Sequence, residues 1–195
     1  MNNAKLAHDI QLDSNQRNII QPLSLLTNKP ILYVVNVDEN EITAEKRSPE
    51  LQKLIDFAEK RGNAAIQLCG KLEAEISNLQ DEEKSFFLEE YNLCEYGLDK
   101  FIHVSYKLLG METFFTIGDK EIRAWTIKNG MSAQQAAGTI HSDIERGFIK
   151  AEVYTYKELI QYKSELALKD TGKIRQEGKN YVVQDGDIIY FKFNV

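Results

Sequence analysis

One short apolar run limits what this 195-residue chain can fold into. Residues 31–35 read Ile-Leu-Tyr-Val-Val, a continuous stretch without the alternation of a half-buried strand. Such runs are typical of parallel strands that are covered on both faces. The run ends abruptly on Asn36-Val37-Asp38-Glu39. Open α/β sheets bind ligands just beyond the carboxyl ends of their strands, so we expect an α/β fold with a binding loop here.

The next residues continue a strand–helix–strand pattern. After Pro49, apolar residues recur at helical spacing, and Gly62 marks the end of this helix. Residues 64–69 form a second buried strand, and further helices are expected over residues 81–91 and 98–109. Two parallel strands leave the backbone donors and acceptors on their outer edges unpaired. A domain of roughly 90 residues built on such a sheet also buries too little surface to be stable. We therefore interpret the first half as the C-terminal part of a doubly wound domain.

After Gly110 the pattern changes to strands separated by turns. Strand-like segments lie at residues 114–116, 121–127, 149–154 and 188–193, and Ser132 is the expected N-cap of a helix that ends at Ile140. The last strand alternates, which predicts that only one of its faces is covered. Two strands, a helix and further strands within about 85 residues predict an α+β β-grasp (ubiquitin-like) domain. We place the domain boundary near Gly110–Met111.

Composition narrows the class of protein. The net charge of −6 argues against nonspecific electrostatic binding of nucleic acid by the surface as a whole. A local basic patch is compatible with this charge. Cys69 and Cys94 have neither metal spacing nor disulfide density, which indicates a reducing compartment. The sequence contains no signal-peptide pattern and no apolar run long enough to span a bilayer. We therefore expect a cytoplasmic protein without a membrane partner.

The residues of the first loop allow two interpretations. They can form a polar turn that caps the strand, or they can bind a planar ring, because an amide and a carboxylate supply donors and acceptors to a ring edge. GTPases carry Asn-Lys-x-Asp at the equivalent place, and its aspartate accepts hydrogen bonds from guanine. Here Val37 replaces the lysine and Glu39 replaces the aspartate. This form fits adenine better than guanine.

The wider sequence adds a family resemblance. It is carried by "NKPILYVVNVDE", "LCGKLEAEI", "EIRAWTIKNGMSAQQAAGTIHSDIERGFIKAEV" and "GKIRQEGKNYVVQDGDIIYFKFNV". From about Leu23 to Val195 the chain resembles the YchF / Obg-like ATPase family of translation-factor-class P-loop NTPases. The resemblance implies that residues 1–22 end an inserted helical, coiled-coil region and that residues 23–110 are the C-terminal half of the nucleotide-binding (G-type) domain. Residues 111–195 would be a TGS domain, which is a β-grasp module.

The resemblance also implies nucleotide-binding residues. Asn36 and Glu39 match the family's Asn-x-x-Glu motif, which is associated with preference for ATP over GTP. Val37 matches the position that packs on adenine and hydrogen-bonds it through the backbone. The residues Leu68, Cys69 and Gly70 match the loop that closes over the base. In the full-length family the cofactor is ATP with Mg²⁺, ATP is hydrolysed, and the protein associates with the ribosome.

The phosphate-binding part of the family pattern is absent from this sequence. A P-loop needs Gly-x-x-x-x-Gly-Lys-Ser/Thr, but Gly70-Lys71 is followed by Leu72, and Gly172-Lys173 by Ile174. No Asp-x-x-Gly segment precedes the base loop either, so the Mg²⁺ ligands are not in this chain. We expect an N-terminally truncated form that lacks the first half of the NTPase domain. It should bind ATP weakly at best and should not hydrolyse it.

The expected partner is the ribosome (the large subunit or the 70S particle) or RNA, bound through the TGS domain. The candidate contacts are Arg123, Trp125, Lys173 and Arg175. Trp125, next to Arg123, is also a candidate for core packing. The basic stretch of Lys169, Lys173, Arg175 and Lys179 fits a solvated loop equally well. A second hypothesis is a stand-alone TGS module that binds RNA, the ribosome or a protein without nucleotide chemistry.

Overall fold

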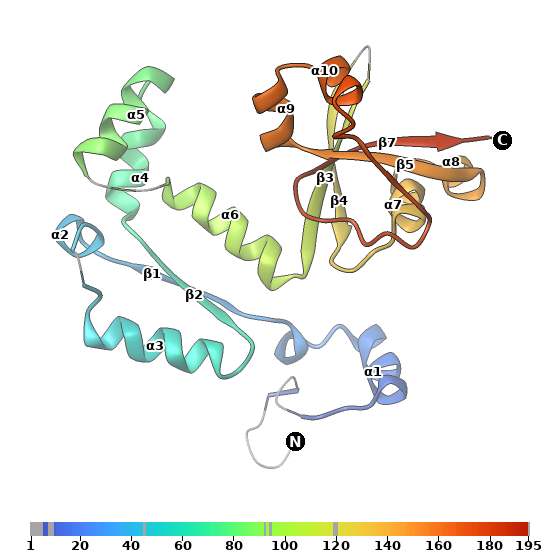
Figure 1. Cartoon of the computed structure of the whole chain (residues 1–195). Coiled ribbons are helices and arrows are strands. Elements are labelled where there is room, and N and C mark those ends of the chain that lie inside the picture. Colours follow the sequence, from blue (N-terminus) through green and yellow to red (C-terminus); the bar gives the residue numbers. More distant parts are fainter. Residues whose placement is uncertain are drawn as a thin grey trace. The chain divides into compact units, whose positions relative to one another are not determined.

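The computed structural model describes residues 6–7, 10–44, 46–91, 93, 95–118 and 121–194 (Figure 1). The chain forms two compact units, Met1–Leu109 and Gly110–Val195. In the described ranges, no helix is long and apolar enough to cross a membrane.

The first unit is built on two parallel strands, β1 (Leu32–Asn36) and β2 (Ala64–Leu68), which pair in register from Leu32 with Ala64 to Asn36 with Leu68. Its helices are α1 (Ser14–Ile20), α2 (Glu39–Ile42), α3 (Pro49–Glu59), α4 (Gly70–Ser77), α5 (Asp81–Glu90) and α6 (Gly97–Leu108), with 3-10 turns η2 (Gln21–Leu23) and η3 (Leu26–Asn28). The predicted strand–helix–strand order is confirmed. Gly62 lies in the turn between α3 and β2 and has φ +67°, a conformation that favours glycine. The short helices α2 and α4 were not predicted.

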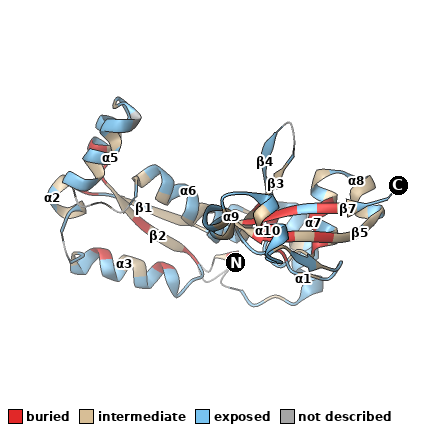
Figure 2. Cartoon of the chain, turned by 45° about the horizontal axis from the view of Figure 1, so that its top comes forward, coloured by how far each residue is buried: buried red, intermediate tan, exposed pale blue. Residues whose placement is uncertain are grey.

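The apolar run of residues 31–35 predicted a strand that is covered on both faces of its sheet. In this unit that prediction is wrong. Val34, in the middle of β1, is 44% exposed. Helix α6 has a strongly amphipathic sequence, yet none of its residues is buried (Figure 2). The exposed apolar residues of α6 include Leu98, Phe101 and Ile102. The physical reason is size, because two strands offer too little surface to bury the helices that flank them.

The second unit contains one mixed five-stranded sheet in the order β4-β3-β7-β5-β6. Strand β3 (Met111–Ile117) pairs antiparallel with β4 (Ile122–Lys128) and parallel with β7 (Asp187–Phe193). Strand β5 (Phe148–Thr155) pairs antiparallel with β7 and with β6 (Arg175–Glu177). The helices are α7 (Ala133–Ile140), α8 (Ser142–Arg146), α9 (Tyr156–Tyr162) and α10 (Glu165–Asp170). The four predicted strands and α7 are confirmed, including the N-cap at Ser132, whose hydroxyl accepts from the Gln135 N–H group.

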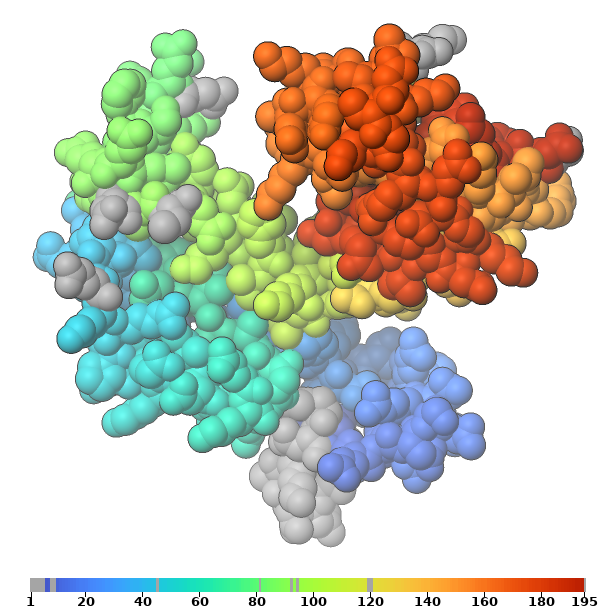
Figure 3. All heavy atoms as spheres, viewed as in Figure 1, coloured from blue at the N-terminus to red at the C-terminus, as the bar shows by residue number. Residues whose placement is uncertain are grey.

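Two apolar clusters lie on opposite faces of this sheet. The larger one joins the sheet to α7 and contains fully buried Phe114, which meets Phe191 edge-on at 5.9 Å between ring centroids. The smaller one contains Tyr154, Leu168 and Ile188. The prediction that β7 is covered on one face only is therefore wrong at Ile188, because Leu168 of α10 packs there. In Figure 3 the segment that contains α9 and α10 is the orange group of spheres at the top of this unit.

Candidate functional site

The predicted base loop forms a pocket at the carboxyl ends of the two parallel strands. Asn36 at the end of β1 pairs with Leu68 at the end of β2, so the residues that follow them emerge side by side. A cavity of about 370 Å³ opens here. It is lined by Asn36, Val37, Asp38, Glu39, Asn40, Cys69 and Lys71. Four of the six residues predicted for the nucleotide site thus line one pocket.

Asn36 is held in place by the second loop. Its Oδ1 accepts a hydrogen bond from the Gly70 N–H group at 2.9 Å. A side chain at Gly70 would place its Cβ 3.2 Å from that oxygen, so the close approach favours glycine. Since Oδ1 is engaged, the amide presents its Nδ2 group as a donor to the pocket.

Val37 and Leu68 are tied together through their backbones. The Val37 N–H group donates to the Leu68 carbonyl at 2.9 Å, and the Val37 side chain is buried. The carbonyl of Val37, rather than its N–H group, is therefore the backbone atom left for a ligand. Leu68 does not line the main pocket. It borders a neighbouring cavity of about 210 Å³, to which Cys69 also contributes.

Glu39 is paired with a residue that the sequence had not singled out. The Lys71 ammonium lies 2.5 Å from Glu39 Oε1. This hydrogen bond, followed by attraction to Glu39 and Glu75, raises the pKa of Lys71. The second oxygen of Glu39 stays available as an acceptor. Lys71 lies in the first turn of α4 after β2, and Glu39 begins α2 after β1, so the parallel register is the signal that would have linked them.

The pocket supplies complementary groups for the edge of a planar ring. Asn36 offers a donor, and Glu39 offers an acceptor, while Val37 and Cys69 are buried apolar residues beside them. An ionised carboxylate only accepts hydrogen bonds, so Glu39 matches an amino group and repels a carbonyl oxygen. In the part of the chain that the structure describes, no group of three or more His, Cys, Asp or Glu residues could hold a metal ion.

The four residues predicted to contact RNA fall into two separate sets. Arg123 and Trp125 lie on β4, one edge of the sheet, with the guanidinium 4.1 Å from the ring centroid. The Trp125 indole donates to Thr116 Oγ1 at 3.0 Å and packs against the larger apolar cluster. Lys173 and Arg175 lie at the opposite edge, just before and at the start of β6. The structure therefore does not bring the four together.

Arg175 contacts a buried carboxylate that was not predicted. Its Nη2 lies 3.4 Å from Oδ1 of Asp187, which is 2% exposed. Asp187 also accepts from the Tyr181 hydroxyl at 2.8 Å and from the Gln184 N–H group at 2.9 Å. Burial, and then the bond to Asp187, raises the pKa of Tyr181 to about 12. In the sequence Asp187 follows a turn dipeptide, and nothing local marks it as buried.

Comparison with known proteins identifies what the chain resembles. The family model YchF-GTPase_C, described as "Protein of unknown function (DUF933)", matches residues 111–194. The "Ribosome-binding ATPase YchF" of Bacillus subtilis (strain 168) is 47% identical over 191 residues, which cover 98% of this chain and 52% of that protein. The protein of the same name from Escherichia coli O157:H7 is 43% identical and is matched over 53% of its length. This chain thus spans about half the length of the curated relatives it matches.

Solved structures agree with these matches. The YchF GTPase of Schizosaccharomyces pombe superposes with a TM-score of 0.79 at 34% identity, covering 98% of this chain and 51% of that one. A GTP-binding protein from Pyrococcus horikoshii OT3 shares the fold with a TM-score of 0.57 at 19% identity. The fold and the matches define an α/β protein related to solved GTP-binding proteins. The chain belongs to the YchF family.

Proposed function

We propose that this chain is the C-terminal portion of a ribosome-associated, ATP-binding protein. In this proposal residues 23–110 recognise the adenine base, and residues 111–195 form a TGS domain that attaches the protein to the ribosome. The observation that carries the proposal is the pocket in which Asn36, Val37, Glu39 and Cys69 converge. The names of the relatives, which state ribosome binding and ATPase activity for those proteins, support the same conclusion.

Adenine recognition follows from the groups at the pocket. The free oxygen of Glu39 accepts from the exocyclic amino group of adenine, and the Asn36 amino group donates to a ring nitrogen. Guanine carries a carbonyl oxygen where adenine carries the amino group, so the same carboxylate repels guanine. Val37 and Cys69, with Leu68 and Gly70 behind them, form the surface on which the ring packs.

The second unit has features of a TGS domain. Its sheet order, with the first and last strands parallel at the centre and a helix after the first hairpin, supports a β-grasp fold. The unit also has its own two apolar clusters, and this observation favours the alternative function of a stand-alone module that binds RNA, the ribosome or a protein. Both functions place the protein in the cytoplasm.

ATP hydrolysis belongs to the complete protein in this proposal. The phosphates and Mg²⁺ need a P-loop and a switch segment, which this sequence does not contain. Base contacts without the charge-assisted phosphate contacts give weak binding. We therefore expect this chain to bind ATP only at millimolar concentrations, without turnover, and its melting temperature to change little with ATP and Mg²⁺.

The test is to follow backbone amide signals of the chain by NMR while ATP or GTP is added. We expect ATP to shift the signals of Val37 and Gly70 and GTP to shift them far less. Glu39→Gln should remove this preference, since an amide can donate to the guanine carbonyl. Glu41→Gln, which makes the same charge change on the same helix away from the pocket, should retain it. Equal shifts with both nucleotides, or shifts confined to other residues, would refute base recognition here.

A further inference from the structure

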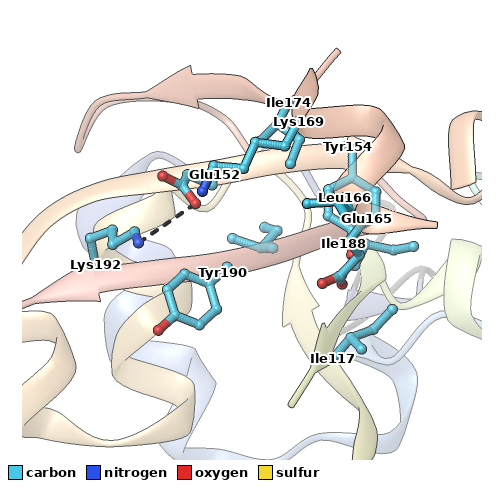
Figure 4. A pocket seen from close by; sticks show the side chains of 11 residues that line it. Ile117, Glu152, Tyr154, Glu165, Leu166, Lys169, Ile174, Ile188, Tyr190 and Lys192 are labelled. Atoms are coloured by element: carbon cyan, nitrogen blue, oxygen red, sulfur yellow. Dashed lines mark hydrogen bonds and ion pairs between the residues drawn. The ribbon is translucent and has the colours of Figure 1, made fainter. Parts of the chain in front are cut away.

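Another pocket lies in the second unit, on the sheet face that carries the smaller apolar cluster (Figure 4). Its volume is about 380 Å³. Strands β7 and β5 form its floor, and α10 forms one wall. The apolar part of the lining is Ile117, Leu166, Ile174, Ile188 and Ile189. Arg123, Trp125, Lys173 and Arg175 do not line it, whereas Lys169, which belongs to the same basic stretch as Lys173 and Arg175, does.

An exposed aromatic ring stands at this pocket. The Tyr190 side chain projects from β7 and is 54% exposed, although β7 is the central strand of the sheet. The Lys192 ammonium lies 4.8 Å from its ring centroid. Leu166, on the α10 side, is 69% exposed. A large aromatic side chain left in solvent on a central strand provides a stacking surface.

Positive charge gathers around this ring. Lys150 on β5 stands directly opposite Lys192 on β7, an arrangement of like charges that destabilises a sheet unless an anion lies nearby. Glu152 lies 3.8 Å from Lys192 and offsets one of the two charges. Lys169 lines the pocket from α10 and forms no ion pair with any described residue. Glu165 accepts a hydrogen bond from the Tyr154 hydroxyl and so already has a partner.

These charges set the face apart from the rest of the chain. Among the residues that line the pocket, Lys169 and Lys192 balance Glu152 and Glu165, and the neighbouring Lys150 brings the formal charge of these five residues to +1, whereas the whole chain carries −6. An aromatic ring flanked by ammonium groups suits a ligand that joins a planar ring to an anionic group. Nucleotides of a single-stranded nucleic acid have this composition.

We propose that this face, centred on Tyr190 with Lys150, Lys169 and Lys192, is a binding site for single-stranded RNA. One base stacks on Tyr190, and the flanking phosphates contact the lysines. This inference rests on the proposed attachment of the second unit to the ribosome and names the surface that makes it. An added peptide strand is disfavoured, because β5 and β7 lie inside the sheet and their backbone groups already pair with neighbouring strands.

The experiment uses the full chain and a fluorescein-labelled oligouridine, with affinity measured by fluorescence anisotropy at several salt concentrations. Tyr190→Leu should weaken binding about tenfold, whereas Tyr190→Phe, which keeps the ring, should bind like the wild type. Lys169→Gln combined with Lys192→Gln should lower the slope of log K against log salt by about 1.4, because each phosphate that a lysine neutralises contributes about 0.7 to the slope. Thermal melting confirms that each variant is folded.

Two control variants test other surfaces. Lys179→Gln removes a lysine whose backbone carbonyl accepts from Gln134 of α7, away from this face, and should leave the affinity unchanged. Arg123→Gln tests the stacked pair on β4 and should also bind like the wild type. The inference is overturned if Tyr190→Leu keeps full affinity or if Arg123→Gln causes the larger loss. Binding of polyglutamate in place of RNA, with the same dependence on Tyr190, would instead assign the face to an acidic protein.

Ribosome co-sedimentation separates this inference from the proposed function. If Tyr190→Leu pellets with ribosomes as well as the wild type does, RNA binding at this face is refuted and ribosome association stands. If the wild-type chain neither pellets with ribosomes nor binds RNA, both fail. Loss of pelleting in Tyr190→Leu, together with retention in Tyr190→Phe, supports both.

Discussion

The carboxylate of Asp187 should be the most costly polar group to remove from the second unit. It is almost fully buried and accepts two short hydrogen bonds, from the Tyr181 hydroxyl and the Gln184 N–H group. Asp187→Ala would leave both donors without this acceptor. Hydrogen bonds to a charged group contribute about 1.5–3 kcal/mol each.

The expected cost follows from these contacts. The two short bonds together predict a loss of about 3–6 kcal/mol in the free energy of unfolding. The contact with Arg175 adds less than about 1 kcal/mol, because it is 3.4 Å long and the guanidinium is 44% exposed. Asp187→Asn keeps the size and one acceptor oxygen but turns the other atom into a donor, so about 2 kcal/mol is expected. Asp170→Asn, an equal charge change at an exposed site, should stay within about 0.5 kcal/mol.

The assay is urea unfolding followed by tryptophan fluorescence. Trp125 is the only tryptophan of the chain and lies in the second unit, so the signal reports the unit that contains Asp187. A loss below about 1 kcal/mol for Asp187→Ala would refute the assignment of Asp187 as the acceptor that holds this turn. An equal loss of stability in Asp187→Asn and Asp187→Ala would also refute this assignment.

Two further predictions concern the same unit. The pKa of Tyr181 is raised to about 12, so its neutral form stabilises the fold fully below its ordinary value of 10.0, and this contribution disappears as pH rises toward 12. Tyr181→Phe should therefore remove a component near pH 12 from the tyrosine absorbance titration, while Tyr154, whose pKa burial and its bond to Glu165 raise further, still titrates above it; a loss of signal near pH 10 would contradict this. Gly147→Ala would place Cβ 2.3 Å from the Asn194 carbonyl oxygen and should cost about 1–3 kcal/mol in unfolding experiments. Gly178→Ala, where nothing lies within 4 Å, is its control, and equal stability of the two variants would show that the backbone around Gly147 relaxes freely.

Elements with a strong local pattern were predictable. The apolar runs indicated β1 and β2 because parallel strands are typically short segments with an uninterrupted apolar sequence. Ser132 indicated the start of α7 because its hydroxyl satisfies a backbone donor that the helix leaves open. The short elements β6, α8, α9 and α10 were missed, since a few residues carry too little periodicity to be recognised.

The candidate site was predictable in its ligand chemistry and only partly in its geometry. Asn36 and Glu39 were found because they lie at and just beyond the end of a strand, where a ligand is expected. Lys71 was missed because its contact with Glu39 depends on the register between two strands that are far apart in the sequence. Arg123 and Arg175 were both predicted to contact RNA, but the strand order places them on opposite edges of the sheet.

The sequence by itself determined the longer strands and helices and the loop that carries polar groups, because hydrophobic period and capping act between near neighbours. Only the tertiary structure decided which residues meet. Packing of α10 reaches Ile188 but leaves Tyr190 exposed, and Asp187 is buried at the start of β7, where the Tyr181 hydroxyl and the Gln184 N–H group donate to it. These outcomes depend on contacts between distant segments, and local sequence patterns do not encode such contacts.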